Sequence, residues 1–184
     1  SPHKLKLRFK NEIYRLRRAV GQEIVAYEDA LYKFNRSLDF EYDVEAFEAF
    51  LSRAKSTTDP LKQIEYYQTA VDLVHGPFLE DIYADWVMLE RERLSQVYLS
   101  TLITLGELLY KQAQWERALA VCQRALDYEV TLEAAYALLM QVYHRMGDRP
   151  AIMRTYQTCE EVMQRELGLP PSKETRDLYK RLIS

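Results

Sequence analysis

Apolar residues recur at helical spacing over a long central stretch, and neither glycine nor proline interrupts it before Gly106. Gly76-Pro77 ends the preceding helix, because proline has no amide proton and restricts the residue before it. Glu80, Asp81 and Asp85 fall where the new helix would begin, and its dipole favours negative charge there. We therefore expect one helix of about 25 to 28 residues, on which both halves of the chain pack. Its apolar positions are Trp86, Leu89, Leu94, Val97, Leu99, Leu102, Ile103 and Leu105.

A shorter amphipathic helix and a hairpin are predicted near the N-terminus. Residues 4–20 have the helical pattern, and Gly21 follows as a C′ residue would. The period then changes from about 3.6 to about 2 in residues 23–27 and 31–34, which flank a turn at residues 28–30. A third extended run is expected at residues 38–42. The apolar face of the helix consists of Leu5, Phe9, Ile13, Leu16 and Val20.

From Asp43 onward the pattern is helical throughout. Asp43 is the expected N-cap of one helix, and Pro60 the expected first residue of the next. Near the C-terminus, Gly168 and two prolines end a helix, and Ser172 would cap a short last helix over residues 174–182. That helix is expected to cover the exposed end of a stack.

Similar side chains recur at an interval of 34 residues in this helical part. Small residues return where two helices must approach closely, and large ones lie between them. The pattern resembles a degenerate tetratricopeptide repeat, with a weaker earlier copy over residues 47–70. The first copy contains Leu105, Gly106, Leu109, Ala113, Trp115, Ala118, Cys122 and Ala125, and the second contains Leu139, Met140, Tyr143, Gly147, Arg149, Ile152, Tyr156 and Cys159.

The composition indicates the cellular setting and argues against most kinds of enzyme active site. About half of the residues are apolar, with fourteen tyrosines and few glycines or prolines, which favours interlocking helices. Cys122 and Cys159 fall within helical patterns as small apolar residues, which fits a reducing, cytoplasmic setting. No apolar run reaches the roughly 18 residues of a membrane span. His3, His75 and His144 are far apart, and no nucleophile frame or phosphate-binding loop occurs, so we expect no metal, no cofactor and no enzyme activity.

Charge is unevenly distributed along the chain. Residues 4–18 contain seven basic side chains and one acidic one, a local charge of +6, whereas the whole chain carries −3. A basic first segment on an acidic remainder is expected when one end meets a polyanion. Without further context, the simpler interpretation is a solvated charged helix face.

Residues 13–21, followed by the strand Leu31-Tyr32-Lys33-Phe34, resemble the recognition helix and wing of a response-regulator-type winged helix. The sheet and two helices that precede these elements in that family are absent before Lys4, so we expect a fragment of a longer regulator. The resemblance implies contact with promoter DNA through the intact winged helix. The residues expected to contact DNA are Lys6, Lys10, Asn11, Tyr14, Arg17 and Arg18.

A set of motifs over residues 40–184 closely resembles the bacterial transcriptional activator domain of SARP-type regulators. The motifs are Asp43-Val44-Glu45-Ala46-Phe47, Gly76-Pro77-Phe78-Leu79, Asp85-Trp86, Glu90-Arg91-Glu92-Arg93-Leu94, Glu116-Arg117-Ala118-Leu119, Arg124-Ala125-Leu126 and Glu166-Leu167-Gly168-Leu169-Pro170-Pro171-Ser172. We therefore expect a partial winged helix over residues 1–42 and the activator domain over residues 43–184. The fold class is all-α: about seven helices in tetratricopeptide-like antiparallel pairs, with an N-terminal helix and β-hairpin before them.

Gly76, Pro77, Phe78 and Trp86 form the expected structural motif. We interpret Trp86 with Phe78 as a buried anchor for the turn, in preference to a ligand cage. Most tyrosines should lie in the core or line a groove, and some of them could contact a partner peptide.

The expected function is a DNA-binding regulator whose helical domain contacts proteins. The partners considered are RNA polymerase, another regulator domain and a second copy in a homodimer, without a membrane. The alternative is a protein-interaction scaffold that makes no direct contact with DNA.

Overall fold

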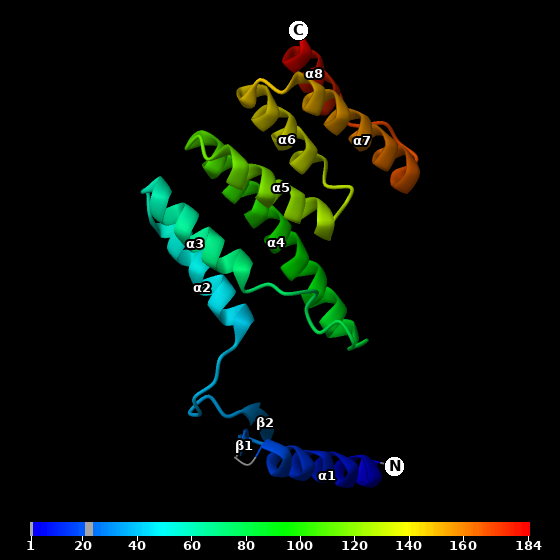
Figure 1. The fold of residues 1–184 in the computed structure, drawn as a ribbon. Helices are drawn as coiled ribbons and strands as arrows, with labels where there is room; N and C mark the ends of the chain where they lie inside the picture. The colour runs from blue at the N-terminus through cyan, green and yellow to red at the C-terminus, as the bar shows by residue number, and fades with distance from the viewer. Residues whose placement is uncertain (1, 21–23) are drawn as a thin grey trace. The chain divides into compact units, whose positions relative to one another are not determined.

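The structure is a computed structural model that describes residues 2–20 and 24–184. The chain divides into two compact units, the first ending at Tyr42 and the second spanning Asp43–Ser184. Figure 1 shows the path of the chain through both.

The first unit contains one helix and one hairpin, as predicted. Helix α1 spans Pro2–Val20, and strands β1 (Val25–Glu28) and β2 (Leu31–Phe34) pair antiparallel, with Val25 opposite Phe34. Asp29 and Ala30 in the turn both have positive φ, 52° and 63°. Two such residues give the turn the twist that the paired strands require. The expected C′ residue Gly21 lies outside the described residues.

The third extended run was predicted wrongly, because the described residues 38–42 contain no strand. The Asn35 amide donates to the Ile24 carbonyl (2.8 Å) at the end of the hairpin. The Ser37 hydroxyl then bonds Asn35 Oδ1 (2.7 Å) and turns the chain away. Side-chain hydrogen bonding by Asn and Ser therefore replaces a further strand.

The second unit is a stack of antiparallel helices (Figure 1), in agreement with the predicted fold class. The central helix α4 has 27 residues, within the predicted range. Consecutive helices pack against one another, and α4 also contacts α6. The helices are α2 (Asp43–Ser56), α3 (Pro60–Asp72), α4 (Asp85–Lys111), α5 (Trp115–Tyr128), α6 (Glu133–Met146), α7 (Arg149–Leu167) and α8 (Lys173–Ile183).

Helix starts follow the capping residues in the sequence. Asp59 accepts a hydrogen bond from the Leu61 amide, with Pro60 at the first helical position. Ser172 likewise accepts from the Thr175 amide (3.2 Å) at the start of α8. Asp43 is itself the first residue of α2, and its carboxylate accepts from the adjacent Val44 amide.

The 34-residue repeat is visible in the backbone. Ala113 and Gly147 occupy equivalent turns and both have positive φ, 55° and 74°. Just after each of them, the amide of Gln114 donates to the Leu109 carbonyl (2.9 Å) and that of Asp148 to the Tyr143 carbonyl (3.0 Å). This is the Schellman arrangement that ends a helix. The pairs α4–α5 and α6–α7 are therefore two copies of one unit.

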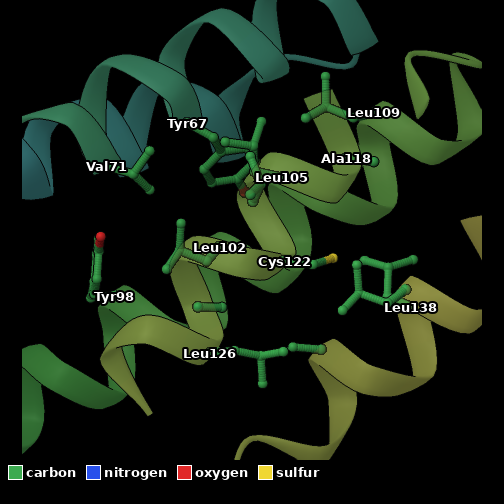
Figure 2. Close-up of a cluster of buried hydrophobic side chains, with 14 of the residues drawn as sticks. Tyr67, Val71, Tyr98, Leu102, Leu105, Leu109, Ala118, Cys122, Leu126 and Leu138 are labelled. Carbon is green, nitrogen blue, oxygen red and sulfur yellow. The ribbon is translucent and has the colours of Figure 1, made fainter. Parts of the chain in front are cut away.

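The core lies where α4 meets α3, α5 and α6 (Figure 2). Leu102, Leu105 and Leu109 on α4 are fully buried. A Cβ at Gly106 would lie 2.8 Å from Leu138 Cδ2, so this glycine permits the close approach of α4 and α6. A second cluster, in which Tyr179 stacks on Tyr156 (4.0 Å between ring centroids), is covered by α8 as predicted.

Candidate functional site

The polar face of α1 presents most of the residues predicted to contact DNA. Lys6, Lys10, Asn11, Tyr14 and Arg18 are all exposed. Positions 11, 14 and 18 of a helix share one face, with 6 and 10 on its flank. Cationic and hydrogen-bonding side chains therefore lie along one side of a helix of 19 residues.

Arg17 differs from the other five because it is partly buried. Its Nη2 atom donates to the Val25 carbonyl at 2.5 Å, which ties α1 to strand β1. Arg17 thus has a structural contact within the first unit. A direct role for it in reading DNA stays a prediction.

Aromatic contacts support the hairpin beside α1. The rings of Phe9 and Tyr32 meet edge to face at 4.9 Å, and Tyr27 lies 4.7 Å from Tyr32. Such pairs stabilise the packing by roughly 0.5–1.5 kcal/mol beyond the burial of their area. The helix and hairpin are therefore held together, as a recognition helix and wing would have to be.

The second candidate site is the turn between α3 and α4, where one prediction was wrong. Trp86 was expected to be buried as an anchor, but 62% of its surface is exposed, and Phe78 is only partly buried. Gly76 has no neighbouring atom within 4 Å of where a Cβ would lie, so close packing does not demand a glycine there. The turn must be held by another group.

That group is Arg91, which lies in the second turn of α4. Its Nε donates to the Phe78 carbonyl (2.7 Å), and its Nη2 bonds the carbonyls of Leu79, Glu80 (3.3 Å) and Ile82 (3.2 Å). Leu79 has a φ of 45°, which is costly for a side chain with a Cβ. A guanidinium with its donors in a fixed fork can satisfy several carbonyls at once and hold this conformation.

Arg124 on α5 plays a similar part at the C-terminal end of α3, just before this turn. Its Nη2 donates to the Val71 carbonyl (2.6 Å) and the Val74 carbonyl (3.2 Å), and its Nη1 pairs with Asp72 (2.8 Å). Its Nε donates to the hydroxyl of Tyr98 on α4 (2.7 Å). A positive charge at a helix C-terminus also complements the helix dipole. Arg124 thus joins three helices.

Comparison with known proteins decides the family. The family model described as the bacterial transcriptional activator domain matches residues 42–183. The chain belongs to this family. The match includes α2 to α8, the turn before α4 and both arginines. The domain is a non-enzymatic part of transcription regulators, in agreement with the expectation from the sequence.

A solved structure extends the similarity to the first unit. Mycobacterium tuberculosis EmbR, in complex with a low affinity phosphopeptide, matches with a TM-score of 0.73 at 14% identity. The match covers 97% of this chain and 49% of the EmbR chain, so the present chain spans about half the length of that protein. At this identity the likeness concerns the fold. No curated protein sequence matches the chain.

Side chains with reactive chemistry are buried in the activator domain. Cys122 and Cys159 are free thiols in the core, and burial raises the pKa of each to about 12. They are therefore protonated and unreactive at neutral pH, as small apolar residues would be.

Within residues 2–20 and 24–184, no group of three or more His, Cys, Asp or Glu side chains could hold a metal ion. No helix of that part is long and apolar enough to cross a membrane.

The tyrosines divide as expected between core and surface. Tyr67, Tyr98, Tyr136 and Tyr156 are buried, whereas Tyr66, Tyr110 and Tyr143 are partly exposed. The Tyr110 hydroxyl accepts a hydrogen bond from Arg145 Nε (3.0 Å), which links α4 to α6.

The sequence did not predict that Arg91 and Arg124 bond backbone carbonyls, although both residues stand in motifs that resemble the family.

Proposed function

We propose that the chain is part of a DNA-binding transcription regulator, with α1 and the hairpin docking on promoter DNA. The observation that supports this most directly is the exposed row of Lys6, Lys10, Asn11, Tyr14 and Arg18 beside a hairpin. Lysine and arginine neutralise phosphates and release counterions, while Asn and Arg can bond base edges in the major groove. Residues 1–42 would act as the recognition helix and wing of a complete winged helix.

The activator domain would contact proteins. Its exposed surface carries the negative excess of the chain, which disfavours contact with nucleic acid. The partners we propose are RNA polymerase, another domain of the same regulator, or a second copy of the chain. A regulator of this kind would act in the cytoplasm, where the bacterial chromosome lies.

Charge reversal on α1 tests the DNA contact. A binding site would first be selected from a pool of random DNA duplexes with the full-length regulator, and affinity then measured by fluorescence anisotropy against salt. Lys10→Glu and Arg18→Glu should each lower affinity at least tenfold and flatten the salt dependence by about one phosphate contact. Arg17→Glu is less suitable, because Arg17 also bonds Val25.

Lys62→Glu and Lys173→Glu are matched controls, since both lysines are exposed on the activator domain. They change the net charge equally but should leave affinity within about twofold. If both α1 variants bound DNA as well as these controls, the assignment of α1 as a recognition helix would be abandoned. The alternative, a scaffold without DNA contact, would then be favoured.

A further inference from the structure

The start of α4 exposes large apolar side chains in close succession. Tyr83, Trp86 and Leu89 are 85%, 62% and 75% exposed, and Met88 and Ile82 are exposed as well. Helix α4 has 27 residues and its neighbour α5 has 14, so the first turns of α4 extend beyond α5 (Figure 1). Groups of exposed large apolar side chains often mark interaction sites in soluble proteins.

The backbone that presents these side chains is fixed. Arg91 bonds four carbonyl groups of the preceding turn, and Leu79 is held at positive φ. On the other face of the same helix, Val87 is fully buried. A surface that is already ordered loses little conformational entropy when a partner binds. Backbone strain that the surrounding structure maintains is a feature of functional sites.

The charged side chains within residues 80–90 are all acidic, and the first basic ones that follow are Arg91, which holds the turn, and Arg93. Residues 80–90 contain Glu80, Asp81, Asp85 and Glu90 and no lysine or arginine. Among the described residues, no ion pair involves Glu80, Asp81 or Asp85, whereas Glu90 pairs with Arg93 (2.6 Å). Asp85 and Leu89 stand four residues apart on one helix face, so carboxylate and apolar groups are interleaved.

This combination selects the class of partner. Nucleic acid and anionic lipid surfaces would be repelled by the carboxylates. An amphipathic helix with an apolar stripe flanked by lysine or arginine complements both properties, since the stripe would cover Trp86 and Leu89 and the basic side chains would face the acids.

We propose that residues 81–89 form a docking surface for a basic amphipathic helix of a protein partner. The inference gives a place and a chemistry to the protein contacts in the proposed function, on which it rests. Trp86 and Leu89 supply the apolar contact, and Asp81 and Asp85 set the charge preference. Arg91 is a positioning residue, because it acts through the turn it holds.

The two tryptophans of the chain make the test specific. Trp86 lies in the proposed surface and Trp115 lies at the start of α5, so indole ¹⁵N labelling gives one reporter inside the surface and one outside. The full chain would be titrated with a synthetic helical peptide that has a leucine stripe flanked by lysines. A second peptide has the same stripe flanked by glutamates. We expect the lysine peptide to shift the Trp86 signal and not the Trp115 signal, and the glutamate peptide to shift neither.

Variants then locate the binding. Leu89→Ser should weaken the lysine peptide at least fivefold, and Trp86→Ala, which removes the reporter, should do the same when binding is followed by the fluorescence anisotropy of a labelled peptide. Asp81→Lys with Asp85→Lys should reverse the preference between the peptides. Met153→Ser, at an exposed methionine of α7, is the control and should bind as the unmodified chain does. Equal binding of both peptides, a shift at Trp115 alone, or no effect of Leu89→Ser would overturn the proposal.

A second copy of the chain is the competing occupant. If the Trp86 signal changes with protein concentration alone, and sedimentation shows a dimer that Leu89→Ser abolishes, the surface is a homodimer contact and the proposal is wrong. DNA affinity separates this inference from the proposed function. Lys10→Glu should lower DNA binding without changing peptide binding, and Leu89→Ser should do the reverse.

Discussion

The two ends of α4 have similar apolar content and opposite surroundings. Near the C-terminal end, Leu102, Leu105 and Leu109 are completely buried between α3, α5 and α6. Near the N-terminal end, Trp86 and Leu89 face solvent because no helix of the second unit covers them. The same residue types are thus core at one end and surface at the other. An apolar side chain stabilises the fold only where a neighbouring element covers it.

Truncation in the buried end should have the largest effect on stability. Leu105→Ala removes a fully buried side chain and leaves a cavity between packed helices. We expect a loss of about 3 kcal/mol in the free energy of unfolding, measured by urea denaturation followed by circular dichroism. A loss below about 1 kcal/mol would contradict the close packing of this region.

Loss of Arg124, the α5 residue that bonds both α3 and α4, should have the second largest effect on stability. Arg124→Ala leaves the carbonyls of Val71 and Val74 without their partner and releases Tyr98. We expect destabilisation by about 2 kcal/mol, because hydrogen bonds to a charged group are lost at a partly buried position. Arg124→Lys should recover only part of this, since lysine lacks the planar fork.

The turn before α4 should respond locally. Arg91→Ala removes the group that holds the carbonyls of residues 78–82, and Leu79 should then leave its positive φ. We expect about 1 kcal/mol of destabilisation, with faster hydrogen exchange confined to residues 78–90. Arg93→Ala is the control, because Arg93 pairs with exposed Glu48 and Glu90 instead. Equal exchange in both variants would mean that Arg91 does not hold the turn.

The exposed end should be the least sensitive. Leu89→Ser changes an apolar residue to a polar one at a site that already faces water, so the free energy of unfolding should change by less than about 0.5 kcal/mol. Equal destabilisation by Leu89→Ser and Leu105→Ala would contradict the difference in burial between the two ends of α4.

Much of the fold could be predicted from the spacing of apolar residues and from the residues that start or end helices. The length of α4 could be predicted because no helix breaker occurs between Pro77 and Gly106. The repeat could be predicted because small residues recur at positions such as Ala125 and Cys159, both buried in the structure. Caps and turns at Pro60 and Ser172 carry local signals that do not depend on distant contacts.

The errors have tertiary causes. Periodicity shows which residues share a face of a helix, but it does not show whether another helix covers that face, so Trp86 was assigned to the interior. Arg91 and Arg124 bond backbone carbonyls, which every residue has, so their partners leave no trace in the sequence. Arg17 stands in a basic run, yet its contact with Val25 depends on how the hairpin meets α1.

The last helix also determines where the domain can be shortened. Met140, Ile152 and Tyr156 are covered by Leu178, Tyr179, Leu182 and Ile183 of α8. A version ended after Gly168 would leave an open apolar face on α6 and α7, and stacked repeats with such a face tend to associate end to end. Crystallisation or binding studies on a trimmed domain should therefore retain the chain through residue 183.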